Sequence, residues 1–285
     1  MGVKYLWNIL EPVKKEVPIT DLKGQTIAVD LSVWICENSG VKAVQGRVVK
    51  PHLRALFFRV SNLLQMGVKL VFVVDGEPPE MKWETISSRV NARFAGRGRR
   101  GGGNPKQRTS RSHFKRFIKE CLELLDFLGV PYVQSKGEAE AMCALLNEKG
   151  IVDACITEDG DVFLYGAGQC IGISTWLESC CSDNQKNPVI ECYRMSDVTE
   201  KLGMSRETLV ALALLLGCDY VPKGVPGVGK VHAMQLVRQL EGKDVLKRFQ
   251  NWSKEPSSSG EKCFVPDVRS NSSVVTIIEY IVLKE

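Results

Sequence analysis

The chain has 285 residues, of which 44% are hydrophobic and 25% charged, and its net charge is +5. These values are typical of a globular protein with a large core, arranged as one large or two smaller domains. The amino terminus lacks a charged and then apolar signal region, and the apolar run 274–283 is too short to span a bilayer and is interrupted by Glu279. We therefore expect neither secretion nor membrane association.

Cysteine and histidine usage argues against disulfide and zinc frameworks. Ten cysteines in a chain without a signal region indicate free thiols of an intracellular protein. No Cys-x-x-Cys spacing occurs, and the three histidines are scattered, so a zinc site is not expected.

The amino-terminal two thirds alternate apolar runs with helical periodicity, which predicts an α/β fold with a central, mainly parallel sheet between helices. Strands are expected at 26–31, 68–74, 132–134, 154–157, 169–171 and 189–193. Helices are expected at 3–10, 52–66, 112–128 and 138–148, with Ser112 as N-cap and Gly129 as C-cap of the third. From residue 196 onward only helices are expected, at 197–202, 206–216 and 230–240.

Positive charge is concentrated in one segment. Residues 82–119 contain twelve Lys or Arg against one acid, Glu84, so this segment carries +11 and the remaining chain 5 − 11 = −6. Within it, 97–103 lacks apolar residues and is expected to be mobile. An acidic body with a basic strip predicts a polyanionic partner, although a solvated charge run is the plainer alternative.

Seven carboxylates stand at the ends of predicted strands or in short acidic pairs. They are Asp30, Asp75, Glu138, Glu140, Asp159, Asp161 and Asp219. Acids at the carboxyl ends of buried strands lie where open α/β sheets bind ligands, and several converging there would repel one another without cations. Each acid alone is open to a plainer interpretation as a helix cap or an exposed turn residue.

The set favours two divalent ions, about 4 Å apart, that clamp the oxygens of a phosphodiester. Magnesium suits a site rich in carboxylates and poor in ligand-spaced histidine. Lys82 and Arg89, seven residues apart on one predicted helix face, could both reach a phosphate near the ions, and Arg93 follows in the same segment.

The segment 224–230, Gly-Val-Pro-Gly-Val-Gly-Lys, nearly matches a phosphate loop of nucleotide triphosphatases. Val231 occupies the position of the hydroxyl that would hold magnesium, and a helix rather than a strand precedes it. A hairpin between two helices is the better interpretation. Gly224, Gly227, Gly229 and Lys230 would then grip a DNA phosphate without contacting bases.

These motifs together resemble the flap endonuclease and XPG-like structure-specific nucleases, and within them the GEN-type Holliday-junction resolvases. The resemblance covers about residues 1–252. The stretches that carry it are 1–7, 29–32, 50–54, 73–79, 137–141, 158–161 and 215–230.

The resemblance implies a PIN-like nuclease core over 1–195, with a basic arch at about 80–111, and a helix-hairpin-helix DNA-binding region over 196–252. Residues 253–285 form a tail unlike the family's continuation, so the chain is expected to be truncated at its carboxyl end. By position, the seven acids match the family's Mg²⁺ ligands, Lys82 and Arg89 match the basic residues at the scissile phosphate, and Gly2 matches a residue near the branch point. Family members often bind duplex DNA at the hairpin through K⁺.

The expected function is therefore a magnesium-dependent endonuclease that cuts branched DNA at 5′ flaps, forks and Holliday junctions during repair and recombination. The free protein is expected to be a monomer that pairs into a homodimer on junction DNA. The expected location is the nucleus, with the cytoplasm as an alternative. Two other functions remain open: a branched-DNA-binding protein whose catalysis is impaired by truncation, and an RNA-directed nuclease.

Overall fold

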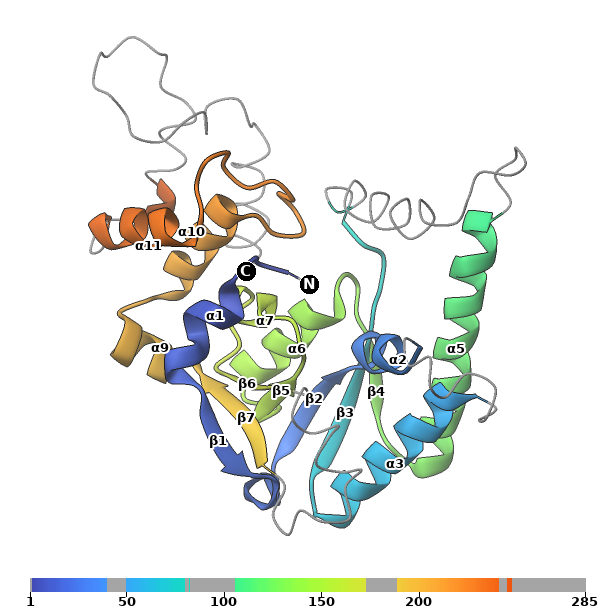
Figure 1. Ribbon diagram of the computed structural model, residues 1–285. Helices are drawn as coiled ribbons and strands as arrows, with labels where there is room; N and C mark the ends of the chain where they lie inside the picture. Colours follow the sequence, from blue (N-terminus) through green and yellow to red (C-terminus); the bar gives the residue numbers. More distant parts are fainter. Residues whose placement is uncertain are drawn as a thin grey trace.

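The structure is a computed structural model that describes residues 2–39, 50–79, 82, 106–172, 189–240 and 245–247. Its centre is a seven-stranded sheet with the strand order β1-β7-β6-β5-β2-β3-β4 (Figure 1). The strands are β1 (Lys15–Pro18), β2 (Thr26–Asp30), β3 (Lys69–Val74), β4 (Tyr132–Gln134), β5 (Ala154–Ile156), β6 (Gln169–Gly172) and β7 (Val189–Arg194).

The sheet is mainly parallel, as the sequence predicts. Strand β2 pairs in parallel with both β3 and β5, and β3 with β4 and β5 with β6 are parallel as well. Only β7 runs in the opposite direction, antiparallel to β6 and to the edge strand β1. The carboxyl ends of β6, β5, β2, β3 and β4 therefore lie along one edge of the sheet.

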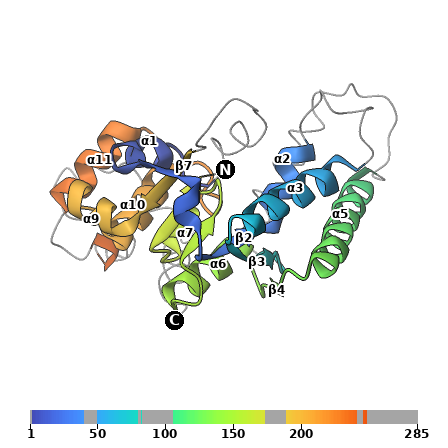
Figure 2. The ribbon, with the colours of Figure 1, turned by 90° about the horizontal axis from the view of Figure 1, so that it is seen from below.

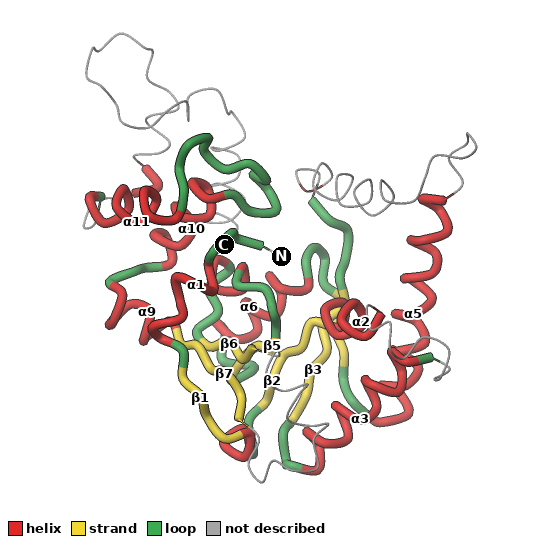
Figure 3. The backbone as a smooth tube through the Cα atoms, viewed as in Figure 1, coloured by secondary structure: helices red, strands yellow, loops and turns green. Residues whose placement is uncertain are grey.

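Helices cover both faces of the sheet, because its strands are buried on both sides. In β2, Ile27 and Val29 belong to one hydrophobic core and Ala28 to the other. The first core includes side chains of α2 (Leu31–Ser39), α3 (Pro51–Gln65) and α5 (Lys106–Leu128). The second includes α1 (Leu6–Leu10), α6 (Ala139–Glu148), α7 (Asp161–Leu164), α9 (Met195–Leu202), α10 (Arg206–Leu216) and α11 (Lys230–Gln239). Figures 2 and 3 show the two groups of helices on opposite sides of the strands.

The chain order creates a switch point beside β2. From β2 the chain proceeds to β3 and then to β4, with α2, α3 and α5 on one face. Helix α6 then crosses on the other face and delivers the chain to β5, on the opposite side of β2. Such switch points leave a crevice at the carboxyl ends of the strands, where α/β proteins bind their ligands.

Helix α10 anchors a helical hairpin to the core. Every residue from Leu209 to Leu216 is buried, so this helix is covered on all sides. Ser205 caps it by accepting a hydrogen bond from the Thr208 amide at 3.3 Å. Residues 217–229 form the hairpin and lead into α11, which returns its Ala233 and Val237 to the same core.

Several elements differ from the sequence-based expectations, among them the short helix α7, where no helix was expected, and α1, which begins at Leu6 rather than at residue 3. Strand β1 has alternating half-buried and exposed residues and ends in Pro18, so it lacks the apolar run of a central strand. Helix α2 follows β2 without an intervening loop, and its composition shows little helical periodicity. Helix α5 begins at Lys106 rather than at Ser112, whereas Gly129 ends it with a φ of 67° as expected.

Two further expectations, the mobility of 97–103 and the character of the tail 253–285, lie outside the described residues. Among the described residues, no helix combines the length and apolarity needed to cross a membrane. Two short 3₁₀ helices are also present, Glu11–Val13 and Ile19–Leu22.

Candidate metal centre

Acids from four neighbouring parallel strands meet at the switch point. Asp30 is the last residue of β2, Asp75 follows β3 directly, and Asp159 is the third residue after β5. Glu138 follows β4 and stands at the N-cap of α6. Together with other residues they line a cleft of about 330 Å³. The lining residues are Asp30, Ser32, Val33, Cys36, Asp75, Lys82, Glu138, Glu140, Glu158, Asp159 and Asp219.

Asp30 is held at the start of α2. Its Oδ1 accepts hydrogen bonds from the amides of Ser32 at 2.8 Å and Val33 at 3.3 Å, so it caps the helix. Only 4% of Asp30 is exposed. Burial, and then the nearby Asp75 carboxylate, raise the pKa of Asp30 to about 7.

Asp75 links three segments of the cleft. Its Oδ1 accepts the amide hydrogen of Ala139 at 2.9 Å, the first residue of α6. Its Oδ2 accepts the hydroxyl hydrogen of Ser32 at 2.5 Å, in the first turn of α2. Both side-chain oxygens of Asp75 are therefore fixed in direction, toward the start of α6 and the start of α2.

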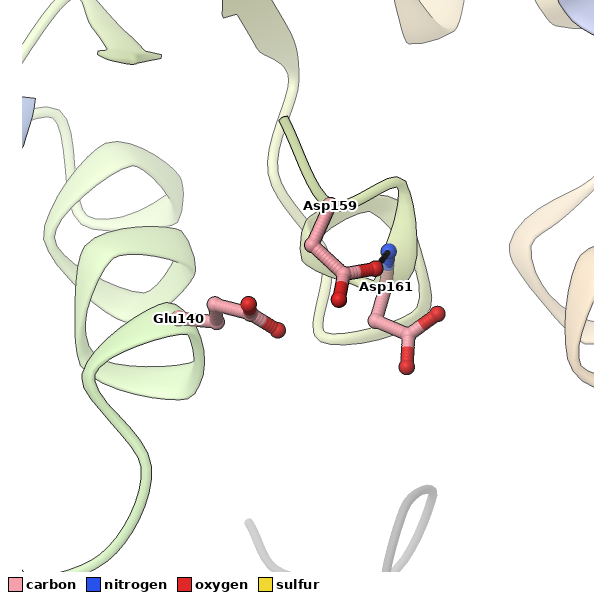
Figure 4. Close-up of side chains that lie close together, drawn as sticks. All are labelled: Glu140, Asp159 and Asp161. Carbon is pink, nitrogen blue, oxygen red and sulfur yellow. Dashed lines mark hydrogen bonds between the residues drawn. The ribbon is translucent and has the colours of Figure 1, made fainter. Parts of the chain in front are cut away.

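Among the described residues, Glu140, Asp159 and Asp161 form an acidic cluster in which one oxygen of each lies within 4.8 Å of the others. Figure 4 shows the Glu140 side chain extending from α6 toward Asp159, with Asp161 on the next turn of chain. The Asp161 amide donates to Asp159 Oδ1 at 3.2 Å, and Asp161 Oδ1 accepts the Val3 amide hydrogen at 2.9 Å.

Burial is the main cause of unusual protonation in this cluster. Burial, and then the neighbouring Asp159, raise the pKa of Glu140 and of Asp161 well above the ordinary range. The pKa of Asp159 is also raised, again mainly by burial. The three carboxylates lie side by side, and their raised pKa values disfavour the ionised forms. A cation bound among them would stabilise the ionised forms.

Lys82 supplies a cation at the other side of the cleft. Its Nζ forms ion pairs with Glu138 Oε1 and with Asp219 Oδ2, the latter at 3.1 Å. Burial lowers the pKa of Lys82, but Glu138 and Asp219 outweigh this effect and raise it above the ordinary value. The ammonium group thus marks a position in the cleft where positive charge is favoured.

Two tyrosines behind Glu138 were not identified from the sequence. Tyr165 follows α7 and donates its hydroxyl hydrogen to Glu138 Oε2 at 2.7 Å. The Tyr220 hydroxyl also hydrogen-bonds to Glu138 Oε2, and the two hydroxyl oxygens are 2.5 Å apart. Tyr220 follows the predicted ligand Asp219 directly, which is the one sequence signal that could have pointed to it.

The other residues selected from the sequence lie around the cleft or outside the described chain. Gly2, at φ 81°, packs so closely on Asp159 that a Cβ there would collide with the carboxylate. Gly224, Gly227, Gly229 and Lys230 lie in the hairpin or at the start of α11 and do not line the cleft. Arg89 and Arg93 fall outside the described residues.

Four further residues line the cleft although no sequence pattern predicted them as a group: Ser32, Val33, Cys36 and Glu158. Their positions depend on helix α2, which was not expected, and on the turn before Asp159. Hydrophobic periodicity cannot predict which residues line a site when the helix that carries them has no clear periodic pattern.

The cleft offers the chemistry of a site for hard divalent cations. Its acidic oxygens suit Mg²⁺ or Mn²⁺ better than a metal that prefers nitrogen or sulfur ligands. The raised pKa values and the ammonium of Lys82 both indicate that the fold concentrates negative charge there. The residues present therefore fit the magnesium ions expected from the sequence.

Comparisons with known proteins agree with this fold. The XPG N-terminal domain matches residues 1–96, and the XPG I-region matches residues 129–219. Flap endonuclease GEN homolog 1 of Homo sapiens is 51% identical over 274 residues, which are 96% of this chain and 29% of that protein. This match covers more than 252 residues, so the similarity extends into the tail 253–285, where no resemblance was expected.

Solved structures give the same result. Human GEN1 in complex with Holliday junction DNA superimposes with a TM-score of 0.72 at 50% identity, covering 88% of this chain and 59% of that one. The catalytic core of Rad2 in complex with a DNA substrate superimposes with a TM-score of 0.69 at 31% identity, covering 96% of this chain and 80% of that one. The chain belongs to the XPG-like family of nucleases that includes the flap endonucleases. It spans about three tenths of the length of the human relative.

Proposed function

We propose that the protein is a structure-specific endonuclease that hydrolyses phosphodiester bonds in branched DNA with the help of two Mg²⁺ ions. The observation that carries the proposal is the cleft itself, in which acids from four adjacent parallel strands surround a favoured cation position. The substrates we propose are 5′ flaps, forks and Holliday junctions, since the human relative is named a flap endonuclease and its solved structure holds junction DNA.

The residues that line the cleft have different proposed roles. Asp30, Glu140 and Asp159 supply carboxylate oxygens that line the cleft, and Asp161 adds an oxygen next to those of Glu140 and Asp159. The two side-chain oxygens of Asp75 keep the starts of α2 and α6 in place. Bound Mg²⁺ would supply Lewis-acid stabilisation of charge on the phosphodiester. Lys82 would add a fixed positive charge at the phosphate, and burial of the acids keeps bulk water from screening it.

DNA contacts are proposed at the end of the sheet where the cleft lies. Figure 1 shows the hairpin after α10 and the amino-terminal end of α5 both beyond the carboxyl ends of the strands. The hairpin residues Gly224, Gly227, Gly229 and Lys230 would hold the duplex backbone, with K⁺ as an additional ligand there. Gly2, which packs on Asp159, would lie near the branch point. Arg89 and Arg93 remain predictions for the scissile phosphate and the arch.

The proposed organisation follows the sequence-based boundaries: a catalytic domain over 1–195, a helix-hairpin-helix region over 196–252 and a tail over 253–285. Two copies would pair on a four-way junction, each nicking one strand. A nuclear location accords with this substrate class, with the cytoplasm as the alternative.

Cleavage of a labelled 5′ flap DNA, followed while Mg²⁺ is titrated, tests the proposal. We expect metal-dependent product from the wild-type chain and none from Asp159→Ala, which should still bind the flap. Binding without metal-dependent product would favour a DNA-binding protein without catalysis. Preferential cutting of matched RNA would favour an RNA-directed nuclease.

A further inference from the structure

Glu138 is held from behind by two phenol groups. Tyr165 and Tyr220 both place their hydroxyl groups on Oε2, while Oε1 contacts the Lys82 ammonium in the cleft. The tyrosines lie together with Asp161, Leu164 and Cys218, and neither tyrosine lines the cleft. The two oxygens of one carboxylate therefore face different surroundings.

The hydrogen atoms available decide how the three groups interact. Two phenols carry two donor hydrogens, and the three oxygens make three close contacts. The carboxylate is the strongest acceptor of the three groups, so Oε2 accepts the hydrogen of one phenol or of both. Each arrangement fixes the direction of Oε2 and leaves Oε1 toward the cleft.

The phenols also connect three segments that carry acids. Tyr165 directly follows the short helix α7, which begins with Asp161, and Tyr220 follows Asp219 at the start of the hairpin. Glu138 stands at the N-cap of α6. A shift of either tyrosine would therefore alter the spacing between acids that come from different elements.

We propose that Tyr165 and Tyr220 are positioning residues, which hold Oε2 of Glu138 so that this carboxylate offers only Oε1 to a divalent ion in the cleft. The proposal rests on the metal-dependent function proposed above. Without the phenols, Glu138 could turn and give both oxygens to Lys82, and a stronger ion pair there would compete with the metal. Partners that orient ligands in this way commonly contribute about 10-fold to 100-fold to metal affinity.

The test compares Tyr165→Phe, Tyr220→Phe and the double variant with the wild-type chain. Each substitution removes a hydroxyl and keeps the ring, so the contact of the Lys82 ammonium with the Tyr220 ring is retained. Tyr193→Phe is the matched control, because Tyr193 is also buried and donates to a carboxylate, Glu191, at 3.2 Å outside the cleft. Tb³⁺ luminescence measures metal binding, and the Mg²⁺ concentration for half-maximal flap cleavage measures its functional effect.

We expect the double variant to need about 10-fold or more Mg²⁺ for half-maximal cleavage and to bind Tb³⁺ more weakly by a similar factor. Each single variant should show a smaller change and the control none, while saturating Mg²⁺ restores most of the rate. Thermal unfolding and metal-free flap binding should match the wild type.

Metal binding by the double variant equal to that of the wild type and the control would overturn the positioning proposal. If the double variant does not fold, the two single variants serve as the test. Metal affinity equal to that of the wild type in both single variants would also overturn the positioning proposal. A wild-type chain that neither binds Tb³⁺ nor cuts DNA would instead overturn the proposed function, so the two failures are distinguishable.

Discussion

The two sides of the cleft balance their negative charge in different ways. On the lysine-paired side, Glu138 and Asp219 share the ammonium of Lys82. On the acid-only side, formed by Glu140 and Asp159 with Asp161 next to them, no ion pair occurs among the described residues, and burial raises the pKa of each acid. The first side therefore has a balancing cation from the chain itself, whereas on the second side a proton or a bound cation would offset the negative charge.

This difference makes metal binding and folding stability interdependent. A metal ion that binds the folded chain and displaces protons from buried acids stabilises the fold, and more strongly as the pH rises. The positive charge of Lys82, by contrast, is part of the chain and is present whether or not a metal ion is bound. The predictions below separate the two sides.

The largest effect is expected on the acid-only side. Asp159→Asn should lower the cleavage rate about a thousandfold or more, because a buried site loses one charged metal ligand. The same change should raise the melting temperature of the metal-free protein, since it removes repulsion between buried acids. Asp197→Asn is the matched control, because Asp197 is also buried but pairs with Lys15 outside the cleft. Flap cleavage and thermal unfolding in EDTA measure both effects, and a metal-free Asp159→Asn chain less stable than wild type would contradict the account.

On the lysine-paired side, Lys82→Met should lower cleavage about 100-fold and destabilise the metal-free protein by about 3 kcal/mol, since two buried acids lose their partner. Added Mg²⁺ should restore part of this stability. Lys15→Met serves as control, because the half-exposed pair of Lys15 with Asp197 contributes at most about 1 kcal/mol. Chemical denaturation with and without Mg²⁺ makes the comparison. Equal losses in the two variants would show that Lys82 has no special place in the charge balance.

The pH dependence of stability should follow the acids whose pKa is raised. Asp30 titrates near 4 when unfolded and near 7 when folded, so the folded state holds more protons between these values. Its contribution to the free energy of unfolding is therefore fully present below about pH 4 and is lost as the pH rises to about 7. Glu140 and Asp161 act in the same direction.

Melting temperatures in EDTA should consequently decline toward neutral pH, and Mg²⁺ should reverse the decline. Asp30→Asn should make the metal-free profile flatter. A metal-free profile that rises steadily from pH 5 to pH 8 would show that the acids are not protonated in the folded state.

The smallest effect is expected far from the cleft. Lys230→Gln at the start of α11 should weaken binding to flap and to plain duplex alike and reduce the salt dependence of binding by about one unit of slope. Cleavage at saturating DNA should change little, since Lys230 does not line the cleft. Lys201→Gln, at the end of α9, is the control, and DNA binding at several salt concentrations is the measurement. A loss confined to branched DNA would assign Lys230 to structure recognition instead.

The sequence predicted the frame of the site because strands leave a local signal. Apolar runs that end in Asp30 and Asp75 are recognisable without any tertiary information, and the parallel sheet then brings their ends together. The acids after β4 and β5 follow from the same rule. The mainly parallel sheet and the helices on both faces are confirmed.

The sequence could not supply the contacts that depend on packing between distant segments. Tyr165 and Tyr220 contact Glu138 because α7, the hairpin and α6 pack close together in the fold. No residue spacing in the sequence predicts this packing. The edge strand β1 was missed since half-exposed residues leave no apolar run. The pairing of Lys82 with Asp219, 137 positions away, likewise emerged only from the fold.

The presence of a two-metal site in the cleft can be examined by anomalous diffraction from crystals of the chain grown with flap DNA and Mn²⁺. We expect two anomalous peaks about 4 Å apart, bordered by Glu140, Asp159 and Asp161 on one side and by Glu138 and Asp219 on the other. A cleft without an anomalous peak, with Mn²⁺ bound elsewhere on the molecule, would contradict it.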